Sequence, residues 1–166
     1  MKRGLWVIAI LAFLAAMAGG GAFADELMDS AEAFFKSYVD GGNHADSYII
    51  DYFADDARIL AVRHLRDGGT ARIGTTGEKH KEYLKKTRRR ARMSKVAMGT
   101  LTTFSDVAYN LEEGCVRITA SRHVSPAQMT TPYSLLICRD GNKQWRIQEE
   151  IIETEELPAV EPGVQP

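Results

Sequence analysis

The chain has 166 residues, with 21 lysines and arginines against 22 aspartates and glutamates and a formal net charge of −1. This length suits a single domain with one hydrophobic core. The near-neutral charge argues against a general nucleic-acid-binding protein, because such domains are normally basic.

The N-terminal segment has the three parts of a secretory signal peptide. Two basic residues open it, an apolar run extends from Leu5 to Ala18, and Ala22-Phe23-Ala24 has the form of a cleavage site. Three glycines end the apolar run before it reaches bilayer length. We therefore expect residues 1–24 to be removed, so that a periplasmic or secreted protein begins at Asp25. The alternative is an uncleaved membrane anchor.

Residues 25–154 are predicted to form one domain that begins with two helices. Asp29 and Glu32 have the spacing of a capping box, and apolar residues at helical spacing follow them until the glycines at positions 41 and 42. A second, shorter helix is predicted in residues 45–56, where Asp55 and Asp56 would close it.

The rest of the domain is predicted to be mainly β-structure. Residues 57–74 predict two strands around an Asp67-Gly68-Gly69 turn, and a basic helix begins near Thr75. One long strand is expected over residues 96–111, bent near Ser105 and Asp106, and further strands over 115–124, 133–140 and 144–154. This order predicts an α+β fold with a curved antiparallel sheet wrapped on the N-terminal helices to form a cone. The acidic residues 155–166 predict a disordered tail.

Several segments resemble the nuclear transport factor 2-like superfamily, over residues 29–154. They are AEAFFKSYVDGG, YFADDARIL, the mid-chain helix and DGNKQWRIQEEI, while TFSDVAYNLEEGCVRITASRHV followed by TPYSLLI is similar to exported bacterial, SnoaL-like members. The resemblance implies a cone-shaped α+β domain, often with an apolar pocket and often dimeric through its sheet. Some members are isomerases, dehydratases or polyketide cyclases and others only bind or associate, so the fold leaves the activity open.

Aromatic residues that carry a polar group are the candidates to line such a pocket. These are Tyr38, Tyr52, Tyr83 and Trp145, and His64 joins them as the histidine predicted in the body of a strand. The alternative is that they are ordinary core or surface residues, which is the commoner role of a tyrosine at helical spacing. No catalytic residue is assigned.

No motif indicates a metal or a cofactor, and we expect neither. The chain lacks the H-E-x-x-H, C-x-x-C, G-x-G-x-x-G and G-x-S-x-G patterns. Two functions stay open: a small-molecule-binding or accessory module, and a small pocket enzyme of the isomerase, dehydratase or hydrolase type acting on an apolar molecule. We expect the module, with a small apolar ligand and a second copy of the chain as partners, and no nucleic acid.

The segment KKTRRRAR, at residues 85–92, has six basic residues and no acidic one. Arg88, Arg89 and Arg90 are candidates for binding an anionic partner, and contact with a membrane is expected only here. The alternative is a solvated helix face, whose cations interact favourably with the helix C-terminus and with the acidic residues 149–156.

The two cysteines, Cys115 and Cys138, lie on consecutive predicted strands. They fall opposite each other if the connection is centred near Pro126 and Ala127, and an oxidising compartment favours a disulfide. A register slip of one residue would place the thiols on opposite faces of the sheet. Two buried free thiols are therefore the alternative.

Overall fold

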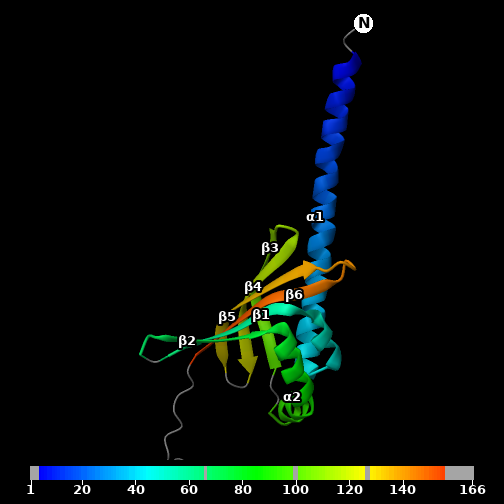
Figure 1. Ribbon diagram of the computed structural model, residues 1–166. Helices are drawn as coiled ribbons and strands as arrows, with labels where there is room; N and C mark the ends of the chain where they lie inside the picture. The colour runs from blue at the N-terminus through cyan, green and yellow to red at the C-terminus, as the bar shows by residue number, and fades with distance from the viewer. Residues whose placement is uncertain (1–3, 66, 99–100, 126–127, 156–166) are drawn as a thin grey trace, which may run out of the picture.

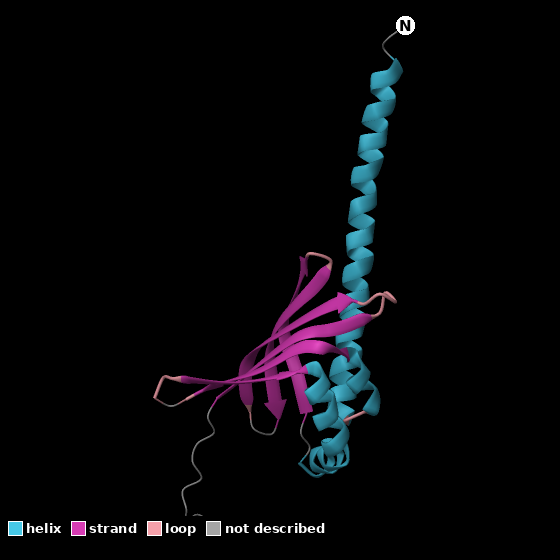
Figure 2. Cartoon of the chain, viewed as in Figure 1, coloured by secondary structure: helices cyan, strands magenta, loops and turns pink. Residues whose placement is uncertain are grey.

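The computed structural model describes residues 4–65, 67–98, 101–125 and 128–155. Two α-helices and a short 3-10 helix lie beside a curved six-stranded sheet, and the first helix extends far beyond the sheet at its N-terminal end (Figures 1 and 2). The predicted α+β fold class is confirmed. Of the proposed tail, residues 156–166 lie outside the described residues.

The first helix, α1 (Gly4–His44), differs from its prediction at both ends. It does not begin at the capping box around Asp29, because the helical backbone continues from the preceding segment, which is rich in alanine and leucine. The glycines at 41 and 42 do not end it either; Ala45, with φ of 53°, follows its last residue. Among the described residues, no helix combines the length and the apolar character that a membrane crossing requires.

The second predicted helix is a single 3-10 segment, η1 (Ser47–Tyr52), and Asp55 and Asp56 belong to the strand that follows. The chain becomes extended at Phe53 because this residue pairs with strand β6 (Trp145–Glu155) and is buried in the core. Gly41 permits the close approach of η1 to α1, since a Cβ there would lie 2.6 Å from a methyl carbon of Ile49 and from the hydroxyl of Tyr48.

Six strands form one sheet in the order β2-β1-β6-β5-β4-β3. Strands β1 and β6 are parallel, and every other neighbouring pair is antiparallel. The predicted hairpin and the four-stranded meander are therefore confirmed. The strands are β1 (Phe53–His64), β2 (Thr70–Thr76), β3 (Leu101–Glu112), β4 (Cys115–Ser125), β5 (Met129–Arg139) and β6 (Trp145–Glu155).

The basic helix, α2 (Gly77–Met98), is longer than predicted, so β3 starts at Leu101 and not at Val96. Its first residue lies directly against β1, where a Cβ on Gly77 would lie 1.8 Å from the carbonyl oxygen of Ala54. Only glycine fits this contact.

The core lies between α1 and one face of the sheet, which we call the inner face. Helix α1 contributes Leu27, Ala31 and Phe35, all of them buried. The sheet contributes mainly branched aliphatic side chains, packed against them in one cluster. They are Ile59 of β1, Val116 and Ile118 of β4, Leu135 and Ile137 of β5, and Ile147 of β6.

A β-bulge in β6 decides which side chains reach this inner face. Two successive residues of β5 pair with Ile147 and Glu149, so Gln148 is an extra residue in β6. Side chains normally alternate between the two faces of a strand. After one extra residue, each following side chain of β6 points to the face opposite the one that alternation from Ile147 would give. Ile147 and Glu150 are therefore both buried on the inner face, whereas Glu149 lies on the opposite, outer face.

A second irregularity bends β3. Its pairing with β4 shifts between Ser105 and Ala108, and Asp106 has φ of 53°. The predicted bend near these residues is confirmed. Through this shift both Phe104 and Tyr109 pack against the core from the inner face, although an odd number of positions separates them.

The outer face carries cross-links between strands. Cys115 and Cys138 pair directly across β4 and β5 and form a disulfide. The carboxylate of Glu149 accepts hydrogen bonds from Arg58 of β1 and Arg117 of β4, the latter over 3.0 Å. Burial alone would raise the pKa of Glu149, but these two guanidinium groups outweigh burial and lower it.

Candidate functional site

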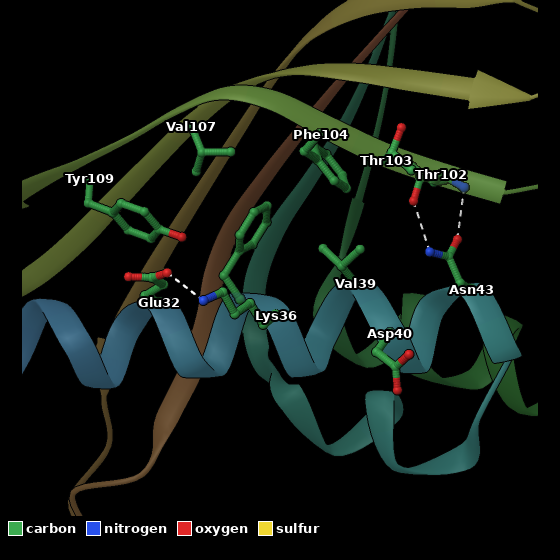
Figure 3. A pocket seen from close by; sticks show the side chains of 11 residues that line it. Glu32, Lys36, Val39, Asp40, Asn43, Thr102, Thr103, Phe104, Val107 and Tyr109 are labelled. Atoms are coloured by element: carbon green, nitrogen blue, oxygen red, sulfur yellow. Dashed lines mark hydrogen bonds and ion pairs between the residues drawn. The ribbon is translucent and has the colours of Figure 1, made fainter.

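An open groove runs between α1 and the edge strand β3. Its volume is about 540 Å³, and we call it the outer groove. Residues of α1 between Glu32 and Asn43 form one wall and residues of β3 between Thr102 and Tyr109 form the other. Figure 3 shows the side chains of Phe104 and Tyr109 pointing from β3 toward the helix. The groove thus has an apolar wall on its sheet side.

Asn43 ties the two walls of the groove together. Its amide nitrogen donates to the backbone carbonyl of Thr102 over 2.8 Å, and its amide oxygen accepts from the backbone N–H of the same residue over 2.9 Å (Figure 3). A side-chain amide can satisfy both backbone groups of one residue of an edge strand. The end of α1 and the start of β3 are therefore held at a fixed separation.

A smaller inner hollow, of about 140 Å³, continues from the outer groove. The two share Val39, Asn43, Thr102 and Phe104 as lining residues. Beyond these the hollow reaches a set of polar side chains on the inner face, which come from three strands and from α1. They are Tyr38 of α1, Arg122 of β4, Tyr133 of β5 and Glu150 of β6.

Glu150 is the buried acid of this hollow, with 3% of its surface exposed. The hydroxyls of Tyr38 and Tyr133 both donate to its Oε1, each over 2.8 Å. Burial raises the pKa of Glu150, although the two hydroxyls and the positive charge of Arg122 act against the rise. Burial and the charge of Glu150 also raise the pKa of both tyrosines, so they remain hydrogen-bond donors. The hollow thus contains a carboxyl group that binds its proton more tightly than in water.

Two other polar atoms on the inner face lack such partners. Arg122 and Thr131 pair directly across β4 and β5. The Nη1 atom of Arg122 and the hydroxyl of Thr131 are buried, and neither has a hydrogen-bond partner within the described part of the chain. A buried donor without a partner carries a desolvation cost of about 1–3 kcal/mol, so native proteins seldom leave one unused.

The structure places only one of the five predicted pocket residues, Tyr38, in the hollow. Tyr52 packs beside it, with its hydroxyl 2.8 Å from Ser37 Oγ, but it does not line either depression. Trp145 is buried in the core, and its indole N–H donates to Ser30 Oγ over 2.6 Å. Both side chains contribute packing.

The structure places His64 and Tyr83 on the surface. His64 is exposed at the end of β1, where its Nε2 lies 2.6 Å from Glu153 Oε2 on the neighbouring strand. Tyr83 is 61% exposed, because α2 turns His80 and Leu84 toward the domain instead. Neither side chain lines the outer groove or the inner hollow.

The basic segment lies on the surface of α2, where Arg89 and Arg90 are exposed. The side chain of Arg88 lies outside the described part of the structure. Binding of an anionic partner by these residues stays a prediction. Among the described residues, no cluster of three or more histidine, cysteine or acidic side chains could hold a metal ion.

Sequence reasoning missed Glu150, Tyr133 and Arg122 as site residues. Glu150 was grouped with the acidic residues 149–156 that could interact with the basic helix, because nothing local reveals the bulge before it. The sequence could have indicated Arg122. It follows Ile118 and Ala120 at every second position of the predicted strand, so its side chain is expected on the same face as these apolar residues. A charged residue in such a row is an unusual core position.

Comparison with known proteins gives matches only at the level of structure. No protein-family model and no curated protein matches the chain. A protein from Novosphingobium aromaticivorans, described as nuclear transport factor 2-like with a cystatin-like fold, matches with a TM-score of 0.50 and 12% identity, covering 96% of this chain and 93% of that one. The chain has the nuclear transport factor 2-like fold.

Two further solved structures share this fold. The β subunit of a putative aromatic-ring-hydroxylating dioxygenase from the same organism matches with a TM-score of 0.54 and 13% identity, over 81% of this chain and 93% of that one. ActVI-ORFA from Streptomyces coelicolor matches with a TM-score of 0.50 and 12% identity, over 76% and 96%. At such low identity the nuclear transport factor 2-like fold is what the matches establish, and the function must come from the site.

Proposed function

We propose that this domain binds a small molecule, with the apolar body of the ligand in the outer groove and its polar end in the inner hollow. The observation that carries the proposal is the continuity of the two depressions around Phe104 and Val39. The groove is open to solvent and apolar on its β3 side, whereas the hollow ends at Glu150 and Arg122. Small-molecule sites combine these two features: an apolar wall and a few converging polar groups.

The dimensions support a small ligand. Ligand sites usually have volumes of about 300–1,000 Å³, and the outer groove, at about 540 Å³, falls within that range. The inner hollow, at about 140 Å³, has room for little more than a polar head group. We therefore expect an elongated molecule that enters from the α1–β3 side.

Binding can be tested with the uncharged fluorophore N-phenylnaphthylamine, whose emission rises in apolar surroundings. We expect saturable binding to the wild-type protein and a loss of at least about tenfold in affinity for Val107→Trp, which fills the groove from its rim. The matched control is Ile73→Trp, because Ile73 is an exposed apolar residue of β2 outside the groove. Absence of saturable binding, or equal binding by the two variants, would contradict the proposal.

A second candidate function is proton transfer on the bound molecule, and Glu150 is the observation that favours it. A buried carboxyl with a raised pKa, in contact with two tyrosine hydroxyls, has the properties of a general acid or base. The test is isotope exchange in D₂O on whatever ligand native mass spectrometry finds with the purified protein. Glu150→Gln should retain the ligand and lose the exchange; equal exchange by wild type and variant would exclude this role.

We further propose that the domain acts after export. The support is the signal-peptide pattern, and cleavage after Ala24 would leave both depressions complete, since their first lining residue is Glu32. N-terminal sequencing of the exported protein should begin at Asp25. A mature form that still contains Trp6 would contradict this proposal. Pairing of two copies through the sheet stays a prediction.

A further inference from the structure

We infer that the polar end of the ligand is a carboxylate and that Arg122 is the residue that selects it. This inference rests on the proposed function and names the ligand class of the same site. The carboxyl and the guanidinium group of the hollow differ in how many hydrogen bonds the protein gives them. Glu150 accepts two hydrogen bonds from tyrosines, whereas Arg122 Nη1 has no partner within the described residues.

Glu150 does not neutralise Arg122 directly. The positive charge of Arg122 acts on Glu150, yet no ion pair within 4.0 Å joins the two in the described part of the chain. Arg122 as a residue is partly exposed, but its Nη1 atom is buried, and a buried guanidinium nitrogen normally has an acceptor because its desolvation is otherwise uncompensated. A ligand carboxylate would supply this partner and could accept two parallel hydrogen bonds from the guanidinium.

Thr131 lies directly across from Arg122 and adds a second buried polar atom without a partner. Its hydroxyl can donate to an oxygen, so both groups are suited to an acceptor. The hollow, of about 140 Å³, is too small for a bulky head group, which favours a carboxylate over a larger anion.

Within the described chain, the rim of the outer groove offers no free cation that could select a carboxylate in the same way. Lys36 is the cation of the rim, and it is already paired with Glu32 over 2.6 Å; Asp40 adds another negative charge nearby. Charge selection must therefore occur inside the hollow. A neutral polar ligand would leave the charge of Arg122 uncompensated, and a cationic ligand would be repelled by it.

Glu150 makes the binding of an anion depend on pH. The groups that face it are Tyr38 from α1, Tyr133 from β5 and Arg122 from β4. When Glu150 is ionised, it repels a ligand carboxylate, and when it is protonated, it does not. Affinity for the carboxylate should therefore rise as the pH falls through the pKa of Glu150, and Glu150→Gln should bind the carboxylate more tightly than wild type at neutral pH.

The experiment displaces N-phenylnaphthylamine from the wild-type protein with straight-chain carboxylates, from butyrate to decanoate, and with the matching uncharged amides. We expect the best carboxylate to displace the probe at a concentration at least about tenfold lower than its amide. Arg122→Met should remove this preference. The exposed control Arg72→Met, on β2, should retain it.

Equal displacement by carboxylates and amides in the wild-type protein would overturn the inference while leaving the proposed function intact. Retention of the preference by a folded Arg122→Met variant would also overturn it. If Arg122→Met does not fold, the wild-type comparison and the tighter binding expected of Glu150→Gln still decide the matter. If the probe itself fails to bind, the proposed function fails and this inference fails with it.

Discussion

The two faces of β6 place neighbouring glutamates in opposite conditions. Glu149, on the outer face, accepts hydrogen bonds from Arg58 and Arg117, and its pKa is lowered. Glu150, on the inner face, is removed from water without an ion pair in the described structure, and its pKa is raised. One residue type therefore stabilises the fold at one position and costs stability at the next when it is ionised.

The same contrast extends over the rest of the sheet. The outer face holds the disulfide and the ion-pair network, which connect different strands of the sheet. The inner face holds an apolar core and, at one end of it, two polar atoms without partners. Groups that cost stability are typical of binding sites, because a ligand can compensate them. Four predictions test this division.

The largest effect is expected from removing the disulfide with Cys115→Ser and Cys138→Ser. The free energy of unfolding should fall by about 3 kcal/mol, because the unfolded chain is no longer constrained by a closed loop. Urea unfolding measures the loss, and wild-type protein under reducing conditions is the control. Since neither cysteine lines the hollow, probe binding to the folded variant should be unchanged. Two reactive thiols per non-reduced wild-type chain would show that the bridge is absent in solution.

The next effect is the loss of the outer carboxylate through Glu149→Gln. We expect a destabilisation of about 2 kcal/mol at neutral pH, because two guanidinium groups lose their shared partner. The folded-state pKa of Glu149 is lowered, so its contribution is present above the unfolded-state pKa and is lost as the pH falls through the folded-state value. The exposed Glu113→Gln is the control. If the difference in unfolding free energy between wild type and Glu149→Gln persisted at acid pH, the effect could not come from the charge of Glu149.

The inner carboxylate should behave in the opposite way. The folded-state pKa of Glu150 is raised, so its favourable contribution is present below the unfolded-state pKa and is lost as the pH rises through the folded-state value. Glu150→Gln should therefore be more stable than wild type at neutral pH, on the order of 1 kcal/mol, and the difference should vanish on acidification. Thermal unfolding across a pH series measures it. A Glu150→Gln variant less stable than wild type at neutral pH would show that the hydrogen-bond partners of the ionised Glu150 carboxylate compensate its burial.

The smallest effect is expected from Thr131→Val, which replaces a buried hydroxyl with a methyl group of similar size. Stability should rise slightly or stay within about 0.5 kcal/mol, because the hydroxyl has no partner to lose. Thr130→Val is the control on the outer face, where the threonine hydroxyl lies 2.8 Å from His123 Nδ1. A clear loss of stability for the Thr131 variant alone would indicate that its hydroxyl is hydrogen-bonded in solution.

Local patterns predicted much of the fold. Alternation and turn residues located the hairpin around Gly68 and the long strands of the meander, because these depend on residues close in sequence. Counting along one connection gave the pairing of Cys115 with Cys138 as one of two alternatives, and it is the one found in the structure. The first helix was predicted too short, since a capping box favours a helix start without preventing an earlier one.

The site was not predictable in the same way. Tyr38 was chosen for its polar group and its helical spacing, but the same argument chose Tyr83, which α2 turns toward solvent. The face of α2 that is buried depends on how this helix packs on β1. That contact involves residues far away in the sequence, so the spacing of Tyr83 within α2 could not reveal it.

By itself the sequence determined the order of most helices and strands, one of the possible registers of β4 against β5, and the presence of two adjacent glutamates near the end of the domain. Alternation from Trp145 and Ile147 would have turned Glu149 inward. Only the tertiary structure reversed this, because the bulge at Gln148 arises where β6 pairs with β5 on one side and with β1 on the other. Local periodicity sets which side chains share a face, but the pairing of distant strands sets where the periodicity shifts.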